Sequence, residues 1–134
     1  MVYMHEMALM ADILNLIQED AYLKKIVKLS SVEIIVGELS NIMPDALEMA
    51  FAIYKEQNPF LFTEQATLLI YIEAAEAECV LCKTVYKPSQ KLSICPNCHF
   101  PSGRMISGET FQIQSYEGEK QNESHLENRC TDKQ

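Results

Sequence analysis

Apolar side chains recur at three- and four-residue steps near the start of the chain, which is the period of an amphipathic helix. The repeating positions are Met7, Met10, Ala11, Leu14, Ile17 and Ala21. They predict a helix over residues 5–21 with one wide apolar face suited to packing on a sheet. A second stripe predicts a helix over residues 43–56, with an N-cap at Ser40-Asn41 and a stop at Asn58-Pro59.

Three further segments alternate apolar and polar side chains, which is the period of a half-buried strand. They cover about residues 27–39, 67–75 and 110–116. Taken with the two helices, they predict an α+β fold, a small three-stranded sheet packed by two helices. The cysteine-rich segment interrupts this fold between the second and third strands.

The predicted organisation is therefore one α/β domain with an inserted unit. Residues 1–77 form the first part of the domain, residues 78–104 the insert, and residues 105–117 the strand that returns to the domain. Residues 118–134 are polar and predict a disordered tail. No apolar run approaches the roughly 20 residues of a membrane span. Without a secretory signal, we expect a cytoplasmic location.

The formal charge of −8 is unevenly distributed along the chain. Residues 1–78 hold 13 acidic and four basic side chains, whereas residues 79–104 hold no acid and four bases. The four bases are Lys83, Lys87, Lys91 and Arg104. An acidic body disfavours nucleic-acid binding and suits cations and basic partners. The four bases could contact a phosphate, or could offset the negative charge of a metal–thiolate centre.

Two Cys-x-x-Cys knuckles lie in the insert and carry the strongest chemical signal. They are Cys79-Val80-Leu81-Cys82 and Cys95-Pro96-Asn97-Cys98, separated by twelve residues. This spacing lets four thiolates bind one tetrahedral Zn²⁺ in a closed, structural site. Two disulfides are the disfavoured alternative. His99 could replace one thiolate but is favoured as an exposed or supporting residue, while Cys130 and His125 lie in the predicted tail.

The tripeptide Met4-His5-Glu6 opens the first helix and, by pattern alone, favours a surface or capping histidine. Together with five other segments, however, it resembles the hydrogenase nickel-incorporation proteins, the HypA/HybF family, over about residues 4–117. The other segments are Val36–Ser40, Pro44–Phe51, the two knuckles, and Ser107-Gly108-Glu109.

The resemblance implies a nickel metallochaperone and not an enzyme. Such a protein delivers Ni²⁺ to the large-subunit precursor of [NiFe] hydrogenase with a partner GTPase, and sometimes serves urease. It implies His5 as a nickel ligand, with the Met4 amine and the Glu6 backbone. The zinc ligands it implies are Cys79, Cys82, Cys95 and Cys98. This chain has Met1-Val2-Tyr3 before the tripeptide, so the amine can take part only if Met4 is the true start, which we expect.

Functions of two other classes are weighed against this one. A zinc ribbon that binds nucleic acid, or that acts as a protein-interaction module, is the alternative. A metal-dependent enzyme would need an open metal position or a nucleophile beside a base, and the scattered histidines form no such constellation. Strand exchange between two copies would give a homodimer, which the sequence leaves open.

Overall fold

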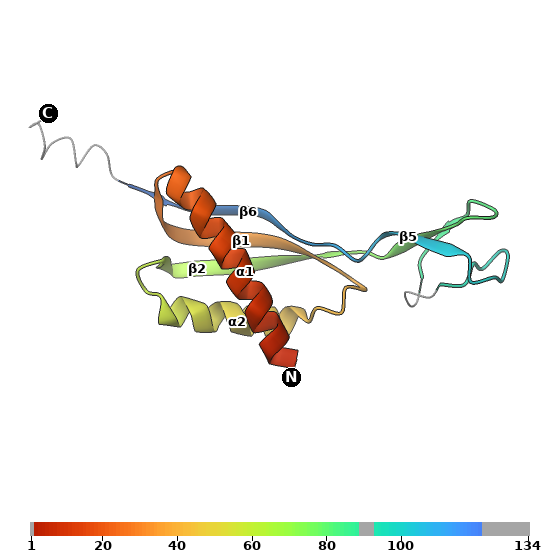
Figure 1. Ribbon diagram of the computed structural model, residues 1–134, viewed down its shortest axis with the longest axis horizontal. Helices are drawn as coiled ribbons and strands as arrows, with labels where there is room; N and C mark the ends of the chain where they lie inside the picture. Colours follow the sequence, from red (N-terminus) through yellow and green to blue (C-terminus); the bar gives the residue numbers. More distant parts are fainter. Residues whose placement is uncertain (1, 89–92, 122–134) are drawn as a thin grey trace, which may run out of the picture.

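A three-stranded mixed sheet with strand order β2-β1-β6 carries both helices on one face (Figure 1). The computed structural model describes residues 2–88 and 93–121. Its α/β elements are α1 (Val2–Leu23), β1 (Ile26–Gly37), α2 (Pro44–Gln57), β2 (Phe62–Glu73) and β6 (Phe111–Lys120). β1 pairs in parallel with β2 and antiparallel with β6. The predicted three-stranded sheet packed by two helices is confirmed.

The core lies between the helices and the central strand β1. Val32, Ile34 and Val36 alternate along β1 toward the helices and are at most 1% exposed. The helical partners in this core are Met10, Ile13, Leu14 and Ile17 of α1 and Leu47, Ala50 and Phe51 of α2. The apolar side chains of the alternating strand pattern and those of the helical patterns therefore pack against each other along β1, as the sequence predicts.

The ends of several elements differ from the prediction. α1 starts at Val2, so Met4 and His5 lie inside the helix. β2 starts at Phe62, five residues before the predicted Thr67. β6 continues to Lys120, which pairs with Ile26, so the prediction of a tail from residue 118 is wrong for residues 118–120. Residues 122–134, with His125 and Cys130, lie outside the described residues.

The predicted N-cap of α2 at Ser40-Asn41 is also wrong. The N-cap residue is Met43, whose own side chain makes no capping hydrogen bond. The backbone N–H of Met43 instead donates to the Glu6 carboxyl of α1 at 3.0 Å. A contact between residues 37 apart in sequence thus replaces the local cap.

The insert forms a second sheet at one end of the molecule (Figure 1). β3 (Glu76–Cys79) lies between β4 (Val85–Tyr86) and β5 (Gly103–Ser107). Ala77 pairs with Met105 inside this sheet, so these two residues, which the predicted bounds assigned to the α/β domain, belong to the ribbon. The ribbon therefore extends two residues beyond the predicted start at 78 and three beyond the predicted end at 104.

Backbone segments come close together where the two sheets join. A Cβ on Gly37 would lie 2.3 Å from the carbonyl of Gly108, and Gly108 has φ of +108°. The Glu73 carboxyl accepts the Gly108 N–H at 2.7 Å, and the Glu38 carboxyl accepts the Ala75 N–H at 2.8 Å. Two glutamates at the ends of β1 and β2 therefore hold both connections to the ribbon.

None of the helices in the described part of the chain is both long and apolar enough to cross a membrane.

Candidate metal centres

The first knuckle arranges backbone N–H groups around a sulfur atom. Leu81 and Cys82 both donate their N–H groups to the Cys79 Sγ at 3.4 Å. Lys83 closes the turn in the left-handed region, with φ of 68°, and its N–H donates to the Cys79 carbonyl at 2.9 Å. Such N–H donors favour the thiolate form of the accepting sulfur.

The second knuckle repeats this geometry. Asn97 and Cys98 donate their N–H groups to the Cys95 Sγ at 3.3 Å. His99 has φ of 65° and donates its N–H to the Cys95 carbonyl at 2.8 Å. The residue after each Cys-x-x-Cys therefore closes the turn with a positive φ and a backbone hydrogen bond. His99 plays this part through its backbone, and its side chain is exposed.

The four sulfur atoms form one cluster, with every pair within 4.8 Å. The Cys79–Cys98 distance is 3.8 Å and the Cys82–Cys95 distance is 3.7 Å. Zn–S bonds of about 2.3 Å in a tetrahedron place sulfurs about 3.8 Å apart, whereas a disulfide requires about 2.05 Å. The cluster fits a tetrahedral Zn²⁺ and does not fit two disulfides.

Polar side chains around the sulfurs favour their ionisation. Asn97 and Thr84 hydrogen-bond to Cys82 and lower its pKa to about 5. The hydroxyl of Ser102 lies 3.1 Å from the Cys79 Sγ and lowers the pKa of that thiol. Sequence reasoning missed Thr84 and Ser102 as supports of the metal site. Thr84 stands two residues after Cys82 and could have been suspected, but Ser102 is brought in only by the fold.

The neighbouring sulfurs act against further ionisation. Cys82, burial and Cys79 together raise the pKa of Cys98 to about 12, because adjacent thiolates repel one another. Cys79 and Cys95 are both 0% exposed. Several thiolates in a buried site need a cation to stabilise their negative charge, and a divalent metal ion that binds thiolate ligands supplies it.

The predicted nickel end of the chain has a different character. His5 is exposed near the start of α1, whereas the Glu6 side chain is 0% exposed. The Glu6 Oε2 accepts the Met43 N–H, and its Oε1 is buried without a hydrogen-bond partner among the described residues. The Glu6 side chain is therefore buried against the start of α2, and its backbone nitrogen remains the predicted nickel contact.

Two of the four ribbon bases are already engaged in ion pairs. The Lys87 ammonium pairs with Glu38, and Arg104 pairs with Glu78 at 2.8 Å. Lys91 lies outside the described residues, and Lys83 is exposed on the first knuckle. Over residues 76–88 and 93–107, the ribbon therefore does not present the unpaired basic row that phosphate binding would require.

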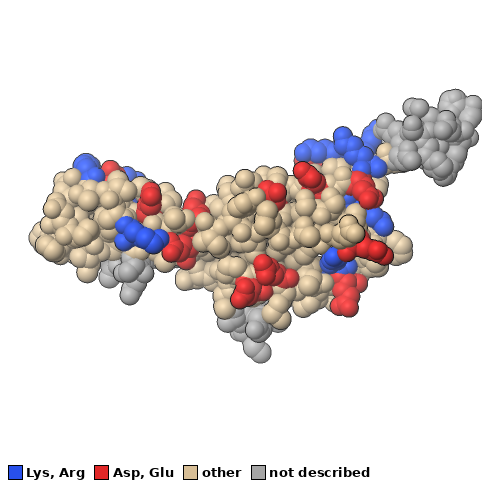
Figure 2. Space-filling view, turned by 180° about the vertical axis from the view of Figure 1, so that it is seen from behind, with Lys and Arg blue, Asp and Glu red and all other residues tan. Residues whose placement is uncertain are grey.

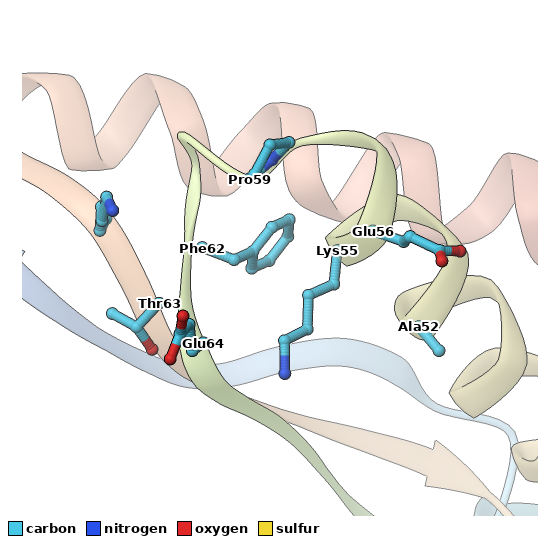
Figure 3. A pocket seen from close by; sticks show the side chains of 8 residues that line it. Ala52, Lys55, Glu56, Pro59, Phe62, Thr63 and Glu64 are labelled. Atoms are coloured by element: carbon cyan, nitrogen blue, oxygen red, sulfur yellow. The ribbon is translucent and has the colours of Figure 1, made fainter.

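A pocket of about 660 Å³ lies between α2 and the start of β2 (Figure 3). Lys55, Phe62 and Glu64 line it together with five other residues, none of them cysteine or histidine. Lys55 donates to the Ala66 carbonyl at 3.0 Å, where β2 slips in register against β1. The residues that line this pocket include no cysteine of the cluster and no residue of the predicted nickel end.

Comparison with known proteins places the chain in a family. Residues 4–118 match the sequence model described as hydrogenase/urease nickel incorporation, metallochaperone, hypA. The chain belongs to this family. The hydrogenase maturation factor HypA of Moorella thermoacetica is 34% identical over 116 residues, covering 87% of this chain and 100% of that protein. The HypA of Lawsonia intracellularis is 36% identical over 121 residues, with the same two coverages.

Solved structures support the fold of this HypA family chain. A HypA protein solved in solution has a TM-score of 0.62 and 28% identity, covering 86% of this chain and 96% of that chain. The nickel metallochaperone HypA from Helicobacter pylori has a TM-score of 0.59 and 24% identity, covering 87% and 98%. The resemblance stated from the sequence motifs is therefore confirmed.

Proposed function

We propose that this HypA family chain carries Ni²⁺ to the large-subunit precursor of [NiFe] hydrogenase, acting with a nickel-inserting GTPase accessory protein. The family description extends the same role to urease. The observation that carries the proposal is the contrast between an exposed His5 at one helix start and a closed four-cysteine cluster in the ribbon. A metal ion that is carried and handed on needs a site where its ligands can be exchanged, whereas a structural metal ion needs a site closed by protein ligands.

The nickel site in this proposal is built on His5. Ni²⁺ favours nitrogen-rich ligands, which the imidazole, the adjacent backbone nitrogens of His5 and Glu6, and the Met4 amine provide when the chain begins at Met4. The Glu6 carboxyl anchors this terminus to the start of α2 without entering the metal site. Exposure of His5 allows handover by ligand exchange.

The zinc in this proposal is structural and is held by Cys79, Cys82, Cys95 and Cys98. Four protein ligands leave no position for substrate, so the chain acts as a carrier and not as an enzyme. A carrier that serves hydrogenase precursors works where they are made, in the cytoplasm. A nucleic-acid role is not favoured, because Lys87 and Arg104 are neutralised by glutamates.

The test is a nickel titration of zinc-loaded protein, measured by isothermal titration calorimetry. The chain beginning at Met4 should bind one Ni²⁺, and His5→Ala should abolish or strongly weaken that binding. His99→Asn is the matched control, since asparagine tolerates the left-handed backbone and the position lies in the ribbon. Equal nickel binding by His5→Ala and the parent chain would contradict the proposed site.

A further inference from the structure

The four sulfur atoms of the proposed zinc site differ in the hydrogen bonds that they accept. Cys79 and Cys95 each accept two backbone N–H groups from their own knuckle. The Thr84 hydroxyl lies 3.1 Å from the Cys82 Sγ, which also accepts a hydrogen bond from a side-chain amide. In the described part of the chain, the Cys98 Sγ has only other sulfur atoms as hydrogen-bond partners. Cys98 is therefore the one ligand for which these residues supply no N–H or O–H donor.

Access to solvent also separates the four cysteines. Cys79 and Cys95 are 0% exposed, whereas Cys82 and Cys98 are partly exposed. The residues on both sides of Cys98 in the sequence are exposed. Among the four ligands, Cys98 alone combines partial exposure with a sulfur that accepts no N–H or O–H hydrogen bond from the described residues.

These two differences decide which thiolate reacts first with an electrophile. A hydrogen-bond donor stabilises a thiolate and lowers its basicity, and the nucleophilicity of a thiolate falls with its basicity. Burial in addition keeps a reagent away from the sulfur. Cys98 should therefore be the most reactive of the four thiolates when zinc holds all of them in their ionised form.

The surface around the knuckles offers no acidic barrier to a small oxidant. Residues 79–104 contain no aspartate or glutamate. Figure 2 shows the ribbon at the left of the view, and its outer end consists mainly of residues that are neither acidic nor basic. Hydrogen peroxide is a small, neutral oxidant that converts exposed thiolates to sulfenic acids, and it suits this surface.

We propose that Cys98 is the thiolate of the ribbon that hydrogen peroxide oxidises first, and that this oxidation releases the structural zinc. The Cys98 sulfur attacks one peroxide oxygen, so that an S–O bond forms, the O–O bond breaks and hydroxide leaves. The product is a sulfenic acid. A second thiolate of the cluster, whose sulfurs all lie within 4.8 Å of one another, then attacks the oxidised sulfur. A disulfide forms, the S–O bond breaks and a second hydroxide leaves.

This oxidation makes the ribbon a redox switch. Two of the four ligands are consumed in the disulfide, and the remaining two no longer close a tetrahedral site. Loss of the metal unfolds a unit whose folding depends on it. The α/β domain has its own core of residues from the helices and the sheet, so it stays folded. The proposal rests on the proposed zinc site and does not depend on the nickel site.

The first test locates the most reactive thiolate in the zinc-loaded, full-length chain. Cys130→Ser leaves the cluster cysteines as the only four in the chain. With less than one equivalent of N-ethylmaleimide, peptide mass spectrometry should find the adduct at Cys98 about ten times as often as at Cys82. Thr84→Val removes the hydroxyl donor of Cys82 and should raise the share of adduct there, whereas Ser102→Ala affects a buried sulfur and should not. An adduct found first at another cysteine overturns the proposal.

The second test uses the same background and follows zinc release by hydrogen peroxide with a zinc-binding dye, 4-(2-pyridylazo)resorcinol. Cys98→His keeps a fourth ligand that cannot form a disulfide, and Cys82→His is its matched control at the other partly exposed position. We expect Cys98→His to slow zinc release about tenfold, and Cys82→His to leave it within about threefold of the parent rate. Dithiothreitol with added zinc should then restore the metal content, because the disulfide is reducible.

The outcomes separate this proposal from the zinc assignment. Zinc that peroxide does not release, equal rates for the two histidine variants, or a loss that dithiothreitol does not reverse would each overturn this proposal and leave the zinc site standing. A purified chain without zinc would end the zinc assignment and this proposal together. Should Cys98→His not retain zinc, the position of the adduct in the Cys130→Ser chain decides the question.

Discussion

Glu6 offers a direct test of how the predicted nickel end is held. The structure buries its carboxyl group completely and makes it the acceptor for the Met43 N–H at the start of α2. Glu6→Ala removes that acceptor and leaves space between α1 and the β1–α2 connection. Glu6→Gln keeps the side-chain length and a carbonyl acceptor, so it separates the hydrogen bond and packing from the charge.

The expected cost follows from three contributions. Loss of the part-buried hydrogen bond from the Met43 N–H to the Glu6 carboxyl costs about 1–3 kcal/mol. Loss of the buried Cγ methylene group costs about 0.8 kcal/mol. Removal of the unpartnered Oε1 offsets part of this free-energy cost, because a buried polar atom without a hydrogen bond is itself unfavourable. We therefore expect Glu6→Ala to lower the free energy of unfolding by about 2 kcal/mol, and Glu6→Gln by about 1 kcal/mol or less.

Urea unfolding followed by far-ultraviolet circular dichroism measures this difference. The helical signal reports on the α/β domain, because both helices lie there and the described residues of the ribbon form only strands, turns and irregular segments. Zinc is kept constant so that the ribbon contributes equally in all variants. A Glu6→Ala protein as stable as the parent would refute the anchoring role, and a Gln variant as unstable as Ala would mean that the charge, not the hydrogen bond, holds the terminus.

The ribbon and its junction give three further predictions. Gly103→Ala should destabilise the ribbon by about 1–3 kcal/mol, because the new Cβ would lie 1.9 Å from the Tyr86 hydroxyl; faster proteolysis of the ribbon would show this. Zinc chelation should unfold the ribbon and expose new cleavage sites there, and an unchanged cleavage pattern would count against coupled binding and folding. Lys87 and the Ala75 N–H hold the pKa of Glu38 below its ordinary 4.5, so this group stabilises the fold above that pH and its contribution is lost as the pH falls. Glu38→Gln should therefore flatten the loss of stability on acidification, and an identical acid profile would contradict that role.

The periodicity of apolar residues predicted the helices and strands whose buried side chains lie on one face of the element. The three- and four-residue stripe of α1 and the alternation along β1 correspond to side chains that face one core. The cysteine knuckles were equally predictable, because ligand type and spacing alone define a tetrahedral site. The cysteine cluster of the structure contains the same four residues.

The errors arise where distant segments decide the local structure. The side chain that caps α2 is that of Glu6 on α1. This tertiary contact replaces the local cap that Ser40-Asn41 predicted. β2 begins early because its register slips between the Leu29–Phe62 and Ser31–Thr67 pairs, which breaks the alternation there. The end of β6 is polar and exposed at a sheet edge, where backbone pairing with β1 requires no apolar pattern.

Native mass spectrometry of protein purified from its own host, with one equivalent of Ni²⁺ added, tests the central claim most directly. The account predicts a chain that carries one zinc and one nickel, with the nickel lost in His5→Ala and the zinc retained. A chain that carries zinc but takes up no nickel would contradict the carrier function and leave only the structural ribbon.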